Sequence, residues 1–220
     1  MSHLNDPVMR QRLQARALEA IYTPKAAATT LPAGDVPALY DMVAEHIGND
    51  PIVYLEFGVY SGHTMRAMTK RFTHPESQFF GFDSFEGLPE AWLTNEQGKF
   101  SRGGHLPRAD DSRVTYVKGW FQNTLPVFLK SVNWSPRVPL LVHYDADLYS
   151  STLFILGNLW PAFQQYYFIF DEFLFDECVA LHDFALAYPV EYTFHAAALS
   201  KGGKPAQVFG HIKRVEFSPG

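Results

Sequence analysis

Short apolar runs alternate with helically spaced patterns from residue 52 to residue 187. Continuous apolar runs are typical of strands that are covered on both faces, as in parallel sheets. Five runs predict strands, at residues 52–57, 78–82, 114–117, 138–144 and 166–170. Helical patterns follow four of them, at residues 61–72, 121–129, from 150 or 151 onward, and 177–187. Ser61 is expected to cap the first of these helices. This alternation predicts right-handed crossover units and a doubly wound sheet.

The C-terminal pattern is different. Residues 191–199 and 206–215 are two further strands, joined by SKGGKP, which is too short for a helix. They therefore predict an antiparallel hairpin. The expected fold class is α/β and Rossmann-like, with a seven-stranded mixed sheet of five parallel-type strands plus the C-terminal hairpin.

The N-terminal part predicts an extension. Residues 7–22 suit an Arg-rich helix with a weak apolar face, and residues 23–34 suit a linker. A firmer helix then begins after the capping residue Asp35. We therefore expect an extension over residues 1–34 and one domain over residues 35–220. Inside that domain, the polar, glycine-containing stretch 86–112 is too long for an ordinary connection and predicts a lid.

Composition limits the partners. Among 220 residues, 18 Lys and Arg against 23 Asp and Glu give a net charge of −5, which argues against nucleic acid and anionic membranes. The one cysteine, Cys178, excludes an internal disulfide and a multi-cysteine zinc site. The sequence shows no signal-peptide pattern and no apolar run of the ~18 residues that a membrane span needs. We expect a soluble cytoplasmic protein, with a homodimer favoured only as the commonest symmetric assembly.

Ligands of open α/β sheets bind beyond the carboxyl ends of the strands. Gly58 and Gly62 follow the first strand, allow a tight turn and open a helix N-terminus, although their spacing is not the dinucleotide G-x-G-x-x-G pattern. Asp83 follows the second strand and could accept hydrogen bonds from a ribose diol or cap the next helix. Gly119 and Trp120 follow the third strand; they could flank a flat ring, or Trp120 could be a core aromatic residue.

Four carboxylates follow the fourth and fifth strands: Asp145, Asp147, Asp171 and Glu172. Their mutual repulsion would be relieved by a hard cation with oxygen ligands, of which Mg²⁺ is the first candidate. Alternatively, one or two of them cap helices and the others are solvated. His143 shares a strand face with Asp145 and is either a core residue or a proton acceptor.

Five segments together resemble the macrocin O-methyltransferase family. They are LEFGVYSGHTM, GFDSFEGLPEAW, VKGWFQNTLPVFL, HYDADLYSST and IFDEF, and they span about residues 52–173. Members of this family use S-adenosylmethionine to methylate sugar hydroxyls or related groups in natural-product biosynthesis. The resemblance implies the class I methyltransferase fold and this cofactor.

The resemblance also implies roles by position. The first loop would hold the methionine part of the cofactor, the second its ribose and the third its adenine, while carboxylates would bind Mg²⁺. The residues of the first loop are Glu56, Gly58, Tyr60, Ser61 and Gly62, and those of the second are Asp83 and Ser84. The residues of the third loop are Gly119 and Trp120, and the metal-binding carboxylates are Asp145, Asp171 and Glu172. Asp145 is in addition a candidate cofactor and catalytic residue, together with His143. Family members typically carry Asp where this chain has Glu172.

The predicted function is therefore Mg²⁺-assisted methyl transfer from S-adenosylmethionine to a hydroxyl of a small-molecule acceptor, in which the cation lowers the pKa of that hydroxyl. A second interpretation is a nucleotide-sugar glycosyltransferase that uses Asp145-Ala146-Asp147 as an Asp-x-Asp metal motif. A third is a non-catalytic protein that has kept a cofactor pocket.

Overall fold

The computed structural model describes residues 6–132 and 135–216. The chain forms two compact units, each with its own strands and helices. Unit 1 comprises residues 1–39 and 147–220, and unit 2 comprises residues 40–146.

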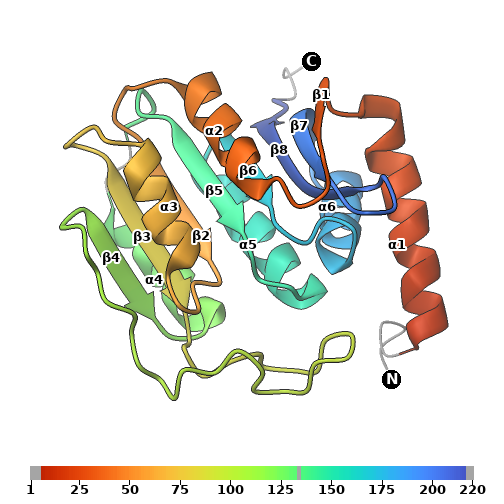
Figure 1. The fold of residues 1–220 in the computed structure, drawn as a ribbon, viewed down its shortest axis with the longest axis horizontal. Helices are drawn as coiled ribbons and strands as arrows, with labels where there is room; N and C mark the ends of the chain where they lie inside the picture. Colours follow the sequence, from red (N-terminus) through yellow and green to blue (C-terminus); the bar gives the residue numbers. More distant parts are fainter. Residues whose placement is uncertain (1–5, 133–134, 217–220) are drawn as a thin grey trace. The chain divides into compact units, whose positions relative to one another are not determined.

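Unit 2 contains four parallel strands and carries the predicted cofactor loops. The strands are β2 (Val53–Phe57), β3 (Gln78–Asp83), β4 (Val114–Lys118) and β5 (Leu140–Tyr144). Their order is β5-β2-β3-β4. Helices α3 (His63–Arg71) and α4 (Phe121–Ser131) lie on opposite sides of this sheet (Figure 1). Most of α2 (Val36–Ile47) also belongs to this unit.

Alternation along β3 explains the two helical layers. Phe80 and Phe82 point to one face, where their rings lie 4.8 and 4.9 Å from that of Phe128 in α4. Gly81 points to the other face, where an added Cβ would lie 2.9 Å from Cε of Met65 in α3. A strand that is apolar on both faces is buried on both, as the uninterrupted apolar pattern predicts.

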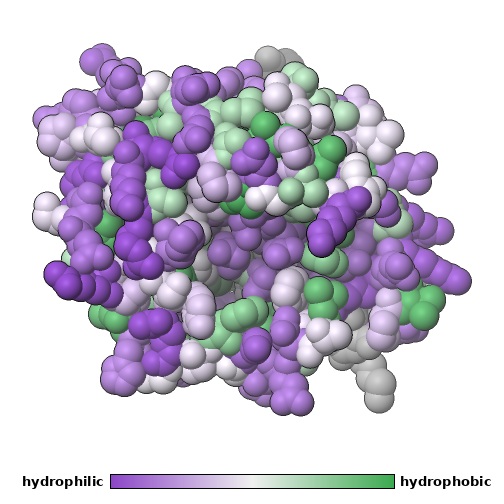
Figure 2. All heavy atoms as spheres, viewed as in Figure 1, coloured by the Kyte–Doolittle hydropathy of each residue, from purple (hydrophilic) through white to green (hydrophobic). Residues whose placement is uncertain are grey.

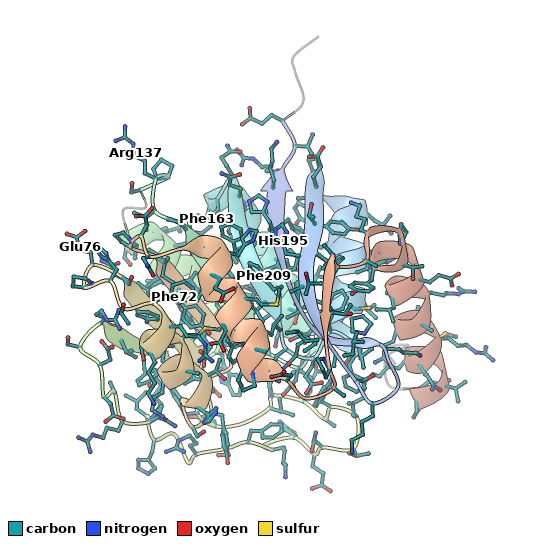
Figure 3. The ribbon with its side chains drawn as sticks, turned by 45° about the horizontal axis from the view of Figure 1, so that its top comes forward. Phe72, Glu76, Arg137, Phe163, His195 and Phe209 are labelled. Atoms are coloured by element: carbon teal, nitrogen blue, oxygen red, sulfur yellow. The ribbon has the colours of Figure 1, made fainter. Side chains whose placement is uncertain are left out.

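Unit 1 contains the other four described strands. They are β1 (Thr29–Leu31), β6 (Gln165–Phe170), β7 (Val190–Leu199) and β8 (Pro205–Arg214), in the order β1-β7-β8-β6. Strands β7 and β8 form the expected antiparallel hairpin, and β6 pairs antiparallel with β8. On this hairpin His195 and Phe209 lie side by side, with ring centroids 5.4 Å apart (Figure 3).

Three helices complete unit 1. They are α1 (Pro7–Ile21), α5 (Tyr149–Ala162) and α6 (Asp176–Ala187), and a short 3-10 helix, η2 (Thr23–Lys25), follows α1. Helix α6 packs against both α1 and α5. Asp6 caps α1, because its carboxylate accepts hydrogen bonds from the amides of Val8 and Met9.

Two expectations are corrected. The described residues hold eight strands rather than seven, because the expected linker contains β1, which pairs parallel with Ala196–Ala198 of β7. Three residues are too few for a strand pattern to be read in sequence, so only this pairing defines the strand. The cap of α3 is Gly62, in a left-handed conformation, rather than the side chain of Ser61.

Residues 84–113 join β3 to β4 without a regular helix or strand, apart from one isolated bridge between Trp92 and Asn95 (Figure 1). This segment is tied to itself, because the amides of Arg102 and Gly104 donate to the carbonyl of Phe85. Its role as a lid stays a prediction.

On the face shown in Figure 2, hydrophobic residues are scattered among polar ones. No helix within residues 6–132 or 135–216 is long and apolar enough to cross a membrane.

Candidate active site

The predicted cofactor loops meet at a topological switch in unit 2. Strand β2 pairs with β3 on one side and with β5 on the other, so the direction in which strands are added reverses at β2. The carbonyl of Phe57 accepts a hydrogen bond from the amide of Asp145 at 2.9 Å. The amide of Gly58 donates to the carbonyl of Phe82 at 3.0 Å. Three loops therefore begin together at the carboxyl edge, where open α/β sheets bind ligands.

Gly58 has no room for a side chain. Its φ is +95°, and an added Cβ would lie 1.8 Å from the carbonyl oxygen of Asp145. The loop after β2 can therefore cross the end of β5 only because this residue is glycine. Gly62, with φ +72°, then opens α3, and an added Cβ there would lie 3.0 Å from the hydroxyl of Tyr116.

The carboxylate of Asp83 holds this loop in place. Its Oδ2 accepts hydrogen bonds from the amides of Val59 and Tyr60 at 2.9 and 2.8 Å. Its Oδ1 accepts from the amide of Phe85 at 2.7 Å. Tyr60 is half exposed and has φ 46°, an uncommon conformation for a residue with a side chain. Asp83 thus ties the first loop to the second, and its binding of ribose stays a prediction.

The second and third loops contain the remaining predicted cofactor residues. Ser84 is buried, and its hydroxyl accepts from the amide of Glu86 at 3.0 Å. The amide of Gly119 donates to the carbonyl of Asp83 at 2.9 Å, so the two loops start side by side. Trp120 is half buried and is the N-cap residue of α4. The adenine-flanking role of Gly119 and Trp120 stays a prediction.

A buried polar cluster lies beneath the first loop. Tyr54, Glu56 and His143 are each 0% exposed. The hydroxyl of Tyr54 donates to Oε2 of Glu56 at 2.8 Å and lies 2.8 Å from Nδ1 of His143. Burial, and then the charge of Glu56, raise the pKa of Tyr54 well above its usual value. Sequence reasoning did not single out Tyr54, although its two-residue spacing from Glu56 on a strand indicates a shared face.

The carboxylates predicted as metal ligands divide between the two units. Asp145 belongs to unit 2, whereas Asp171 and Glu172 belong to unit 1. Oδ1 of Asp171 accepts a hydrogen bond from the side-chain amide of Gln207 at 2.6 Å. A cation shared by Asp145 and Asp171 stays a prediction.

Asp147 is one of the four carboxylates that the sequence places after the fourth and fifth strands. Burial raises its pKa to about 7, with further contributions from the charges of Asp171 and Asp176. Burial and the charges of Asp171 and Asp147 likewise raise the pKa of Glu172 to about 7. Asp147 is thus electrostatically coupled to Asp171 and Glu172 within unit 1. Asp147 was expected from the sequence in this carboxylate cluster and in the Asp-x-Asp motif, whereas the family resemblance placed only Asp145 of the pair at the metal.

Glu177 adds a further buried carboxyl group to this unit. It is 0% exposed, and its Oε2 accepts a hydrogen bond from the amide of Glu172 at 3.0 Å. Burial, and then the charge of Asp171, raise its pKa well above the usual value. In the part of the chain that the structure describes, no three His, Cys, Asp or Glu side chains are grouped so that they could hold a metal ion.

No family model matches the chain. A curated relative from Streptomyces olivaceus is 28% identical over 193 residues, which cover 70% of each chain. That protein is the 8-demethyl-8-(2,3-dimethoxy-alpha-L-rhamnosyl)-tetracenomycin-C 4'-O-methyltransferase.

Solved structures share the fold. The O-methyltransferase of Bacillus cereus in complex with S-adenosylhomocysteine has a TM-score of 0.54 and 10% identity, covering 96% of this chain and 94% of its own. The TDP-rhamnose 3'-O-methyltransferase of calicheamicin biosynthesis has a TM-score of 0.51 and 19% identity, covering 98% and 90%. The chain therefore has the Rossmann-like fold of these O-methyltransferases, and its sequence is similar to that of the O-methyltransferase from Streptomyces olivaceus.

Proposed function

We propose that the chain transfers the methyl group of S-adenosylmethionine to a hydroxyl on the sugar of a small natural product. The observation that carries this proposal is the loop at the switch point, where Gly58 must be glycine and Asp83 ties two loops together. The relative from Streptomyces olivaceus is named for methylation of a rhamnosyl group, which supports a deoxysugar as the acceptor.

The chemistry requires an oriented and deprotonated oxygen. The acceptor oxygen attacks the sulfonium methyl group in line, and S-adenosylhomocysteine leaves. Holding both reactants in this geometry supplies a large part of the rate acceleration. Of the two proton acceptors expected from the sequence, Asp145 is kept in the proposal, whereas His143 is fully buried and contacts the hydroxyl of Tyr54. Asp147 is an additional candidate, because a carboxyl group with a pKa of about 7 suits a general base at neutral pH.

Mg²⁺ is part of the proposal. The ligands expected from the sequence are Asp145, Asp171 and Glu172, which supply oxygen only. Asp147 is added to them because its charge is coupled to those of Asp171 and Glu172. Among the described residues, no three such side chains are grouped so that they could hold a metal ion. A bound divalent cation would supply Lewis acidity that makes the acceptor hydroxyl more acidic.

The first experiment is a ligand-stabilisation and calorimetry screen. We expect S-adenosylhomocysteine to stabilise the protein and to bind with micromolar-order affinity, a free energy of roughly 8 kcal/mol. Absence of binding at millimolar concentration would contradict the proposed function. Stabilisation by uridine diphosphate with Mn²⁺ instead would favour a glycosyltransferase.

The second experiment is turnover. The protein is incubated with S-adenosylmethionine and a panel of rhamnosylated aromatic natural products, and methylated product is detected by mass spectrometry. We expect methylation of a sugar hydroxyl, its loss on chelation and its recovery with added Mg²⁺. Full activity in the presence of chelator would remove the metal from the proposal but leave methyl transfer intact.

A further inference from the structure

The three side chains of the buried cluster are brought together by the register of the sheet. Tyr54 and Glu56 are two residues apart on β2 and therefore face the same side. His143 on β5 is the direct register partner of Glu56. The cluster lies just before the loop that begins at Gly58, so its members are fixed by regular backbone rather than by a flexible segment.

The hydrogen-bond directions in the cluster follow from counting protons. The phenol of Tyr54 has one proton, which it donates to Oε2 of Glu56. The contact of 2.8 Å with His143 must then be donated by the imidazole, so Nδ1 carries a proton. The result is a one-way relay in which His143 donates to Tyr54 and Tyr54 donates to Glu56.

This relay stabilises the ionised form of Glu56. A carboxylate that is 0% exposed has lost its hydration and needs charge-assisted donors in its place. A phenol that itself accepts a hydrogen bond is a stronger donor than an isolated one. The ring of Tyr40, from α2, lies edge-on to His143 with centroids 5.9 Å apart, which completes the packing around the imidazole.

We infer that Tyr54 and His143 are positioning residues, which keep the Glu56 carboxylate ionised beneath the first loop, so that its negative charge attracts the ammonium group of S-adenosylmethionine. The inference rests on the proposed role of Glu56 toward the methionine part of the cofactor. It assigns His143 a role different from that of a proton acceptor in methyl transfer, because Nδ1 is committed to Tyr54 inside the sheet.

The groups that face the cluster come from each neighbouring element. Tyr40 faces it from α2 and Asp145 from the end of β5, since both contribute to the raised pKa of Tyr54. Burial, and then the charge of Glu56, raise the pKa of Tyr116 on β4, whereas the charge of Arg66 on α3 lowers it. Arg66 is therefore a positive charge close to Tyr116. Its Nη1 donates a hydrogen bond to the carbonyl of Ser61.

The decisive variant is Tyr54→Phe, which removes the hydroxyl and keeps the ring. We expect the Kd of S-adenosylhomocysteine, measured by calorimetry at pH 8, to rise roughly tenfold or more, since the variant removes a hydrogen bond to a charged group. At saturating S-adenosylmethionine, kcat should change little while KM rises. Affinity should also fall at a higher pH than in the wild type when the solution is acidified, because Glu56 protonates more easily without its donor.

A control variant and two variants of His143 distinguish an effect on cofactor binding from an effect on folding. Tyr166→Phe also removes the hydroxyl of a buried tyrosine, in β6 of unit 1, and should leave the Kd and its pH profile unchanged. His143→Asn retains a donor near the position of Nδ1 and should keep affinity close to that of the wild type. His143→Leu removes the donor and should weaken binding in the same direction as Tyr54→Phe.

The outcomes are separable. A folded Tyr54→Phe protein with the wild-type Kd and pH profile overturns the inference, as does a loss of thermal stability without a change in Kd. If Tyr54→Phe does not fold, equal affinities of His143→Asn and His143→Leu overturn it. If the wild type itself fails to bind S-adenosylhomocysteine, the proposed function fails first.

Discussion

Gly58, in the first predicted cofactor loop, has no space for a side chain. Gly58→Ala places a methyl group where the carbonyl of Asp145 now lies, 1.8 Å away, at a φ of +95°. We expect a loss of several kcal/mol in the free energy of unfolding or a displaced loop, together with lost cofactor binding. Chemical denaturation and calorimetry measure the two effects.

Gly48→Ala is the matched control for this variant. Gly48 has a similar φ of +87° but nothing within 4 Å of an added Cβ. It should cost only about 1 kcal/mol, from the left-handed backbone alone. Equal effects of the two substitutions would show that the close approach to Asp145 does not matter.

Asp83 is a second residue that holds the first loop in its conformation. Asp83→Ala leaves three backbone amides without their acceptor, and we expect it to destabilise the protein by about 1–3 kcal/mol. It should also weaken cofactor binding, both through the loosened loop and through the lost ribose acceptor. Thermal melting and calorimetry test this.

Asp41→Ala is the comparison for Asp83→Ala. Asp41 is a carboxylate with 61% side-chain exposure that pairs with Arg71. Its removal should cost less than about 1 kcal/mol, as for surface ion pairs. If the Asp83→Ala protein were as stable as the Asp41→Ala protein, the hydrogen bonds of Asp83 to the two loops would not contribute to stability.

At the scale of elements, a buried ion pair ties α1 to the start of α6. Asp176 is 1% exposed; it lies 3.5 Å from Nη2 of Arg10 and accepts a hydrogen bond from Gln14 at 2.9 Å. Arg10→Ala leaves this carboxylate buried without its cation, and we expect it to reduce the free energy of unfolding by about 3 kcal/mol. Denaturation in urea measures this change.

Arg16→Ala, on the exposed side of the same helix, is the control for this prediction. It should stay within about 0.5 kcal/mol of the wild type. If the Arg10→Ala protein were as stable as the Arg16→Ala protein, the buried ion pair would not contribute to the attachment of α1 to α6.

At the scale of the whole molecule, raised carboxyl pKa values should make stability depend on pH. Asp147 and Glu172 have folded pKa values of about 7, above the ~4 of an unfolded chain. Between these values the native state binds more protons than the unfolded state, so stability falls as pH rises from about 4 to about 7. We expect a lower melting temperature at pH 8 than at pH 5.5.

The double variant Asp147→Asn, Glu172→Gln should reduce this difference between the two pH values. Mg²⁺ should raise the melting temperature of the wild type more at pH 8 than at pH 5.5, since only the ionised carboxylates bind it. A melting temperature that rises toward pH 8 without metal would contradict the assigned pKa values.

The apolar pattern of the chain by itself determined most of the fold. Runs such as VYLEF at β2 are apolar enough to require cover on both faces, which indicates parallel strands and crossover helices. The C-terminal hairpin followed from a connection too short for a helix. Strand β1 could not be predicted in this way, because its three residues carry no periodic pattern and acquire their conformation from pairing with β7.

The positions of the predicted cofactor loops followed from the sequence, because glycines and carboxylates directly after strands must lie at the carboxyl edge of the sheet. Which partners those side chains take depends on register, which no local pattern specifies. Only tertiary structure aligned Glu56 with His143, turned Asp83 toward two amides of the first loop, and coupled Asp147 to Asp171 and Glu172. Hydrogen bonds and burial act between residues far apart in the chain, so these partners were decided by the packing of the strands.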